Sequence, residues 1–317
     1  MPPSSPSQPL TPPPHGTGLA LVTGAGGFIG GHVAAALERS GWRVAALGRR
    51  PFAAPWAEGD LHRDRLRALA ADLGRPELVV HCAGTGSVRA AEDDQDGARR
   101  RTVGGLEQLL AGLSQSAPAA RLVLLSSAAV YGEGEAPKDE QSTPPNPISA
   151  YGRHKLEAET AALSSGLDVA VVRFFSIYGP GLRKQLFFEL YRRLAAGPET
   201  LLLGGTGQER RDFLYIDDAV RLIGLLAALP TGARPRVVNG GSGRPTSVRE
   251  AAEALARAMA SPARVEFSGE VRAGDPRVLV ADPARARALG FEPEVGLDEG
   301  LARYVAWASA ALEIAHG

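Results

Sequence analysis

The stretch Thr23-Gly24-Ala25-Gly26-Gly27-Phe28-Ile29-Gly30 follows the apolar run Leu19-Ala20-Leu21-Val22 and precedes residues 32–39, whose apolar side chains recur at helical spacing. This order predicts a strand, a sharp turn and a helix. At such a turn the free N–H groups of the helix face a pyrophosphate, and a β carbon would obstruct its approach. The stretch therefore predicts a dinucleotide site. The predicted contacts are Gly24, Gly27, Phe28, Ile29 and Gly30.

Short apolar runs alternate with helix-like segments through the first half of the chain. The runs are residues 19–22, 43–47, 78–82, 121–125 and 169–174, and the segments include residues 64–73, 99–114 and 150–163. This alternation predicts an α/β fold, a Rossmann-like doubly wound parallel sheet with helices on both faces. Later the pattern loosens, with helices expected over residues 185–196 and 248–260 among glycine-rich loops.

Composition and pattern together suggest three parts. Residues 1–17 are rich in Pro and Ser and are predicted to be a disordered tail. Residues 18–172 are expected to form the dinucleotide-binding domain, to which residues 213–240 return. Residues 173–212 and 241–317 are expected to form a smaller, mostly C-terminal substrate-binding lobe.

Charge and cysteine content exclude several classes of function. The 35 basic and 35 acidic residues balance, which gives no broad attraction for nucleic acid or an anionic membrane, and no apolar run approaches the roughly 20 residues of a membrane helix. The single cysteine, Cys82, excludes an internal disulfide framework and a thiolate zinc cluster, so no metal is expected. A reducing, cytoplasmic setting follows.

The end of the second expected strand bears on cofactor choice. It carries Arg49-Arg50, whereas an NAD site normally has an acidic residue there to hold the ribose hydroxyls. Two guanidinium groups suit a ribose phosphate, so NADP(H) is favoured and NAD(H) stays open; the alternative is a solvated surface pair. Asp60-Leu61, in the loop that follows, is expected near the adenine, unless it is a plain surface loop.

Three polar residues predict proton transfer. Tyr151 and Lys155 stand four residues apart on an expected helix, which places both on one face. A phenol is a poor base at neutral pH, and a neighbouring ammonium group stabilises its anion. Ser127 follows a buried-looking strand and is placed to hydrogen-bond the same substrate oxygen. The set suits an alcohol or ketone that exchanges a hydride.

Seven motifs lie in order along nearly the whole chain after the tail. They are residues 23–30, His81-Cys82-Ala83-Gly84, residues 125–132, Tyr151-Gly152-Arg153-His154-Lys155, and residues 173–180, 211–218 and 272–276. In this set the chain resembles the extended short-chain dehydrogenase/reductase superfamily, in its nucleotide-sugar epimerase, dehydratase and reductase group. The resemblance implies a nucleotide-diphosphate sugar as the partner. It also implies a homodimer, paired through the helices over residues 99–114 and 150–163.

The resemblance also assigns roles. It implies that Tyr151 is the acid or base, that Lys155 holds the nicotinamide ribose, and that Ser127 orients the substrate. Ala83 joins the implied cofactor contacts. Guanidinium groups match phosphate geometry, which suits two arginines implied to hold the diphosphate, although either would otherwise be read as a surface ion-pair partner. The implied substrate contacts are Ser87, Ser176, Arg211, Arg272 and Asp275.

The residues after Ser127 narrow the reaction. Resembling dehydratases and decarboxylases carry acidic residues there, whereas this chain has Ala128 and Ala129, which do not titrate. Two reactions remain, reduction of an NDP-4-keto sugar by NADPH and 4-epimerisation of an NDP-sugar with retained NAD. Arg49-Arg50 favours the 4-ketoreductase, and the pattern over residues 127–132 supports the 4-epimerase as the alternative.

Other classes of function stay open. The superfamily usually has one asparagine where Ser176 stands and another near Thr102, so their absence leaves the sugar undetermined. A reductase of a non-sugar alcohol or ketone would need no diphosphate clamp. A non-catalytic dinucleotide sensor shares the fold, but the intact Ser127, Tyr151 and Lys155 set argues against it.

Overall fold

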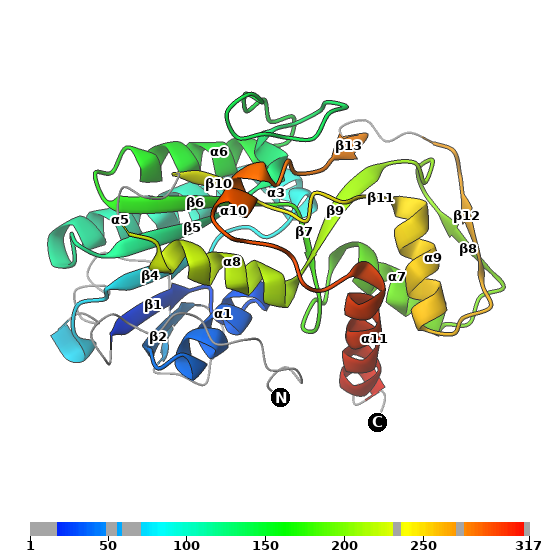
Figure 1. Cartoon of the computed structure of the whole chain (residues 1–317), viewed down its shortest axis with the longest axis horizontal. Helices are drawn as coiled ribbons and strands as arrows, with labels where there is room; N and C mark the ends of the chain where they lie inside the picture. Colours follow the sequence, from blue (N-terminus) through cyan, green and yellow to red (C-terminus); the bar gives the residue numbers. More distant parts are fainter. Residues whose placement is uncertain (1–17, 49–55, 59–70, 231–235, 271–275, 314–317) are drawn as a thin grey trace.

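The computed structural model describes residues 18–48, 56–58, 71–230, 236–270 and 276–313. Figure 1 shows two parts, a large sheet covered by helices and a smaller lobe built around α7, α9 and α11. Several predictions fall outside the described residues, namely the tail over residues 1–17 and the contacts Arg49, Arg50, Asp60, Leu61, Arg272 and Asp275.

The large sheet has seven strands in the order β10-β6-β5-β4-β1-β2-β3, and every neighbouring pair is parallel. Its order reverses at β1, which lies between β2 and β4, and ligands of such sheets bind outside the strand ends at that reversal. The predicted fold class is confirmed. The strands are β1 (Leu19–Thr23), β2 (Arg43–Gly48), β3 (Trp56–Glu58), β4 (Leu78–His81), β5 (Arg121–Ser127), β6 (Asp168–Phe174) and β10 (Val237–Gly240).

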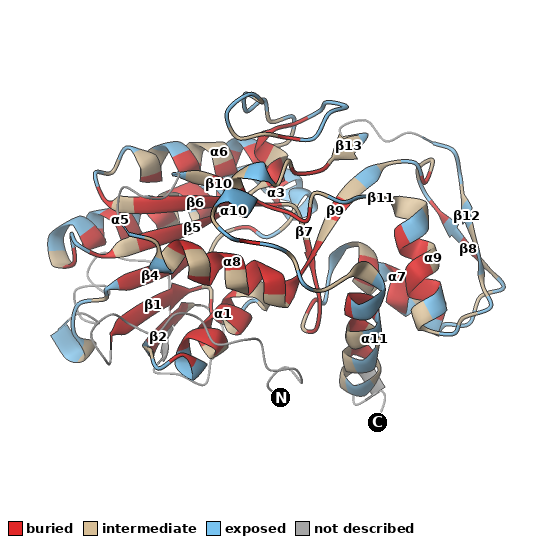
Figure 2. Ribbon diagram, in the orientation of Figure 1, coloured by how far each residue is buried: buried red, intermediate tan, exposed pale blue. Residues whose placement is uncertain are grey.

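Alternate residues of each strand belong to different hydrophobic clusters, because successive side chains leave a strand on opposite faces. In β1, Ala20 and Val22 pack in one cluster, and Leu19 and Leu21 pack in the other. Buried residues therefore line both faces of the sheet (Figure 2). The first cluster includes helices α1 (Phe28–Arg39) and α8 (Ile216–Ala228), and the second includes α5 (Gly105–Ser116) and α6 (Ala150–Leu163).

The helix expected over residues 99–114 is divided. A π-helical turn at Arg100–Gly104 separates α4 (Gln95–Arg99) from α5, and the short helix α3 (Val88–Asp93) precedes them. Glycine is a weak helix former, and Gly104 and Gly105 meet at the junction with α5. Within the π turn, the hydroxyl of Thr102 accepts a hydrogen bond from the Thr85 amide at 3.1 Å. The periodic spacing of apolar residues that predicts an α-helix does not reveal a π-helical turn within it.

Strand β9 is the centre of the smaller lobe, where it pairs in parallel with β7 and β13 and antiparallel with β11. Rings of Tyr178, Phe187, Phe213 and Tyr215 pack beside it. The predicted division stays a proposal. Of the returning segment, α8 and β10 lie with the large sheet, whereas residues 213–215 belong to β9. Helix α10 (Ala284–Ala288) packs on β10 of the large sheet, where Arg285 donates to the Val237 carbonyl at 2.8 Å. The lobe contains β7 (Ser176–Tyr178), α7 (Gln185–Ala195), β8 (Thr200–Leu203), β9 (Arg210–Tyr215), β11 (Pro245–Ser247), α9 (Val248–Ala258), β12 (Arg264–Phe267), β13 (Val278–Leu279) and α11 (Leu297–Glu313).

A buried ion pair joins β6 to α6. The Arg173 guanidinium donates to the Glu159 carboxylate, with Nη2 2.7 Å from Oε2, and the two side chains are 6% and 2% exposed. The Ser126 hydroxyl donates to the other carboxylate oxygen at 2.5 Å. Arg173 also lies over the Tyr131 ring, whose hydroxyl donates to Asn239 of β10. Three strands and one helix are thereby fixed at the same end of the sheet.

We expect Arg173→Leu to lower the free energy of unfolding by about 3–5 kcal/mol, because it leaves the Glu159 charge buried without a partner. Urea denaturation measures this loss. The double variant Arg173→Leu/Glu159→Leu should recover most of it. Arg264→Leu, which breaks an exposed ion pair with Glu199, should cost less than about 1 kcal/mol. Equal costs for the single and double variants would contradict the assignment.

Candidate active site

The glycines of the first loop are required by its own backbone. Gly24 has φ +70°, and a β carbon on it would lie 2.9 Å from the Ala83 nitrogen. A β carbon on Gly30 would lie 2.3 Å from the Gly24 carbonyl oxygen, and Gly27 donates to that oxygen at 2.9 Å. Protein atoms therefore fill the room beside Gly24 and Gly30. The exposed Gly27 is the glycine of the three that leaves space for a ligand.

Helix α1 begins at Phe28 with its first amides available. Its N-cap, Gly27, supplies no side-chain hydrogen bond, and its first turn has no acidic residue. The amides of Phe28, Ile29 and Gly30 have no earlier turn to bond to, and the helix dipole favours an anion there. The start of α1 thus fits the pyrophosphate of a dinucleotide.

Two buried polar residues support this loop from behind. The Thr23 hydroxyl accepts the Ala83 amide at 3.3 Å and lies 2.8 Å from Nδ1 of His81. Burial, helped by the charge of Lys155, lowers the pKa of His81 to about 3, so this ring is neutral at physiological pH. Sequence reasoning named Ala83 as a cofactor contact and placed Thr23 and His81 in the same motifs, without assigning them this supporting role. That role depends on the pairing of β1 with β4, which sets Thr23 beside His81.

The three predicted catalytic residues stand at the end of β5 and the start of α6. Lys155 is buried, and its ammonium group donates to the Leu125 carbonyl at 2.9 Å and lies 5.9 Å from the centre of the Tyr151 ring. Ser127 ends β5, and its hydroxyl accepts the Ala129 amide at 3.2 Å. A β carbon on Gly152 would lie 2.4 Å from the Ala129 carbonyl oxygen, so α6 packs closely on the segment after Ser127.

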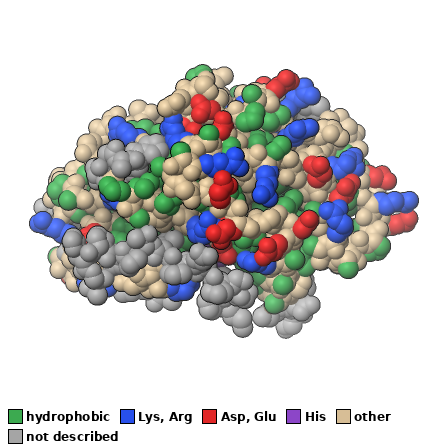
Figure 3. All heavy atoms as spheres, in the orientation of Figure 1, with side chains coloured by type: hydrophobic (Ala, Val, Ile, Leu, Met, Phe, Trp, Pro, Cys, Tyr) green, Lys and Arg blue, Asp and Glu red, His purple; other side chains and the backbone are tan. Residues whose placement is uncertain are grey.

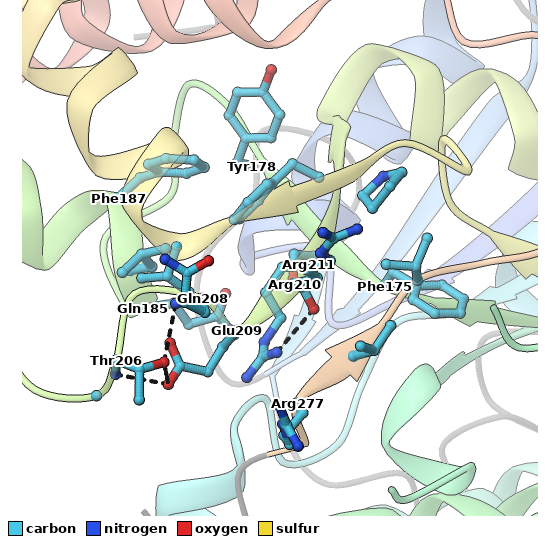
Figure 4. Close-up of a pocket in the computed structure, with 18 of the residues that line it drawn as sticks. Phe175, Tyr178, Gln185, Phe187, Thr206, Gln208, Glu209, Arg210, Arg211 and Arg277 are labelled. Carbon is cyan, nitrogen blue, oxygen red and sulfur yellow. Dashed lines mark hydrogen bonds between the residues drawn. The ribbon is translucent and has the colours of Figure 1, made fainter. Parts of the chain in front are cut away.

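A cavity of about 1100 Å³ lies in the smaller lobe (Figure 4). Two predicted substrate contacts, Ser176 of β7 and Arg211 of β9, line it. Nη1 of Arg211 donates to the Pro276 carbonyl at 2.7 Å, which fixes the guanidinium at the cavity wall. Sequence reasoning missed further lining residues because they come from segments far apart in the chain. Among them are Phe175, Gln208, Arg210 and Arg277.

Ser87, a predicted substrate contact, caps a short helix, and its contact with a substrate stays a prediction. It is the N-cap of α3, its hydroxyl accepts the Ala90 amide at 3.3 Å, and it is not among the residues that line the cavity. An N-cap hydroxyl satisfies one of the free amides at a helix start, so capping accounts for a serine here.

The surface charge, the helices and the remaining polar groups bear on which other kinds of site the described chain contains. Basic and acidic side chains are mixed over the face in Figure 3, as the balanced charge predicts. No described helix has the length and apolar character needed to cross a membrane. In the same described part of the chain, no three His, Cys, Asp or Glu side chains are grouped as metal ligands. Burial raises the pKa of the Cys82 thiol to about 12, which makes it unreactive.

A parallel sheet that reverses at β1, a glycine turn into α1 and a Ser-Tyr-Lys set define an enzyme of the extended short-chain dehydrogenase/reductase superfamily. The chain belongs to the NAD dependent epimerase/dehydratase family, whose model matches residues 20–241. The resemblance stated from the sequence motifs is confirmed.

Similar proteins extend over nearly the whole chain. A UDP-glucuronate 4-epimerase of Thermodesulfobacterium geofontis is 29% identical over 94% of this chain and 98% of its own. The structure of MoeE5 in complex with UDP-glucose and NAD is 33% identical, with a TM-score of 0.84 over 93% of this chain and 100% of that one. A Bacillus cereus UDP-glucuronic acid 4-epimerase, in complex with UDP-glucuronic acid and NAD, is 25% identical, with a TM-score of 0.82 over 92% of this chain and 99% of that one.

These comparisons change the order of the sequence hypotheses. They support the 4-epimerase that was the alternative and give no support to the 4-ketoreductase that was preferred. They also give no support to a preference for NADP(H), since both structures hold NAD. That preference depended on Arg49 and Arg50, and a local pattern of two arginines does not establish that either side chain reaches a ribose.

We expect Gly30→Ala to abolish cofactor retention, because its β carbon cannot fit beside the Gly24 carbonyl. The dinucleotide released from the purified, denatured protein measures this effect. Gly104→Ala is the matched control: Gly104 is also helical, with φ −59°, and a β carbon on it meets no atom within 4 Å. Full cofactor retention by Gly30→Ala would contradict the loop assignment.

Proposed function

We propose that the chain is an NAD-dependent 4-epimerase of UDP-sugars and that UDP-glucuronate is its substrate. The similar proteins support this because two are named for that reaction and two have structures with a UDP-sugar and NAD. In the chain itself, the glycine turn, the Ser127, Tyr151 and Lys155 set and the cavity meet the needs of such a substrate. The homodimer and the cytoplasmic setting stay predictions.

The proposed chemistry moves one proton and one hydride at the sugar C4. NAD, when bound, supplies a reversible hydride acceptor. Tyr151 takes the C4 hydroxyl proton as the 4-ketone forms and returns it when the alcohol of opposite configuration forms. Lys155, fixed by the Leu125 carbonyl, stabilises the tyrosine anion, and Ser127 donates to the sugar oxygen.

The observation that carries the proposal is the absence of a second acid or base after Ser127. Ala128 is 1% exposed and packs in a small cluster with Val130 and Tyr131, and the Ala129 amide donates to Ser127. Elimination would require a further proton transfer at a neighbouring carbon, and no side chain at either alanine supplies it. The two alanines therefore argue against elimination and favour hydride transfer at C4, which is epimerisation when the hydride returns to the sugar.

The cavity supplies charge for the UDP moiety. Arg210, Arg211 and Arg277 line it, and guanidinium groups match the geometry of a diphosphate. Glu135 and Glu209 also line the cavity, and the Glu135 carboxylate lies 3.7 Å from Nη1 of Arg277. Three guanidinium groups against two carboxylates leave the lining with a net charge of +1, which favours an anionic ligand. This arrangement favours a nucleotide sugar over an uncharged alcohol or ketone.

The proposed reaction is tested with purified protein, UDP-glucuronate and no added cofactor. We expect proton NMR to show conversion to the 4-epimer, UDP-galacturonate, until the two sugars reach equilibrium, and the released cofactor to be NAD. UDP-glucose serves as the second substrate, because MoeE5 binds it. Consumption of NADPH with a UDP-4-keto sugar, without epimerisation, would instead identify the chain as a 4-ketoreductase.

Tyr151→Phe should lower kcat by about 10²- to 10⁴-fold, the range that a general acid or base contributes, because the ring stays and the exchanging proton is lost. UDP binding, measured by calorimetry, should stay within about twofold of the wild type. Tyr191→Phe is the control, because its hydroxyl bonds Ser309 in the smaller lobe and it is not a cavity residue. Normal turnover by Tyr151→Phe would exclude its assigned role.

A further inference from the structure

Gln185 has an unusual backbone conformation at the wall of the cavity. Its φ is +66°, a region that side chains with a β carbon rarely adopt. Ala260 is the other described non-glycine residue with positive φ. Ala260 lies at the end of α9, where its amide bonds the Arg257 carbonyl in the usual manner of a helix end, and it is not a cavity residue. Gln185 lines the cavity (Figure 4).

The segment before Gln185 is fixed from two other parts of the chain. Nε2 of His32, in α1, donates to the Pro180 carbonyl at 2.8 Å. The Tyr304 hydroxyl, in α11, donates to the Leu182 carbonyl at 3.1 Å. Both donors are buried, so water competes weakly for these bonds.

The residues directly before and shortly after Gln185 are also held in place. The Lys184 ammonium donates to the Gly86 carbonyl at 2.8 Å, and Phe187, two residues later, is 2% exposed in the core. These contacts hold the main chain, whereas the Gln185 amide makes no hydrogen bond to any residue of the described chain. The fold thus imposes a conformation that glycine would adopt without strain, and a long amide side chain stands there instead.

We propose that the Gln185 amide hydrogen-bonds the UDP-sugar and is a substrate-positioning residue, an inference that rests on the proposed function. The three arginines of the lining attract a diphosphate without fixing the rest of the ligand. An amide offers donors and an acceptor, so it suits the hydroxyl and carbonyl groups of a sugar or a pyrimidine. The positive φ directs this side chain from the start of α7 into the cavity.

The test compares Gln185→Ala and Gln185→Gly with the wild type, all loaded with NAD. We expect calorimetry with UDP-glucuronate to give a dissociation constant about tenfold higher for both variants, because one hydrogen bond is lost. Thermal midpoints should not fall for Gln185→Gly, since glycine relieves the strain. Ala260→Gly, the matched control, makes the same backbone change away from the cavity and should leave binding unchanged.

Binding of UDP without a sugar, measured in the same way, shows which part of the ligand the Gln185 amide contacts. Weaker binding of both UDP and UDP-glucuronate places the amide on the nucleotide, whereas weaker binding of UDP-glucuronate alone places it on the sugar. Wild-type affinity for both ligands in Gln185→Ala overturns the inference and leaves the proposed function intact. Failure of the wild type to bind either ligand overturns the proposed function instead.

Discussion

The buried pair of Arg173 and Glu159 sets the position of the helix that carries the chemistry. Two charges removed from water are tolerated only with good geometry and further hydrogen bonds, which Ser126 supplies here. Glu159 stands four residues after Lys155, which stands four after Tyr151, so all three lie along one stripe of α6. The ion pair therefore fixes the rotation of α6 against β5 and β6, and that rotation aims Tyr151 and Lys155 at the strand ends.

Burial around this stripe makes the charge of Lys155 effective. Its ammonium group donates to a backbone carbonyl, and His81, whose pKa is lowered by burial and by the charge of Lys155, is neutral. A second cation beside Lys155 would oppose it, and a carboxylate would neutralise it. The neutral His81 serves instead through its contact with Thr23, which in turn holds the Ala83 amide beside the glycine turn. One set of hydrogen bonds thus connects the glycine turn after β1 to β4, which pairs with the strand whose Leu125 carbonyl binds Lys155.

What the sequence predicted well was local. The β1 turn and α6, with its bounds at residues 150 and 163, follow from periodicity and glycine spacing within about 15 residues. The π turn at Thr102 and the lining residues Gln208 and Arg277 depend on packing between distant segments, which no local pattern encodes. The predicted preference for NADP(H) lacks support for the same reason. The pair Arg49-Arg50 shows that positive charge is present but not where the two guanidinium groups lie relative to the cofactor. The alanines after Ser127 were informative because an alanine lacks a titratable group in any position.

One buried hydrogen bond joins α1 to the segment that leads to the cavity wall at Gln185. His32 lies one turn after Phe28 on α1 and meets its ring edge to face, at 5.7 Å between centroids. Because Nδ1 of His32 has no partner and a carbonyl only accepts, Nε2 carries the proton given to Pro180. The Pro180 carbonyl begins the segment that ends at Gln185. The start of α1, where the dinucleotide is expected, and the strained wall of the cavity are therefore positioned by the same buried ring.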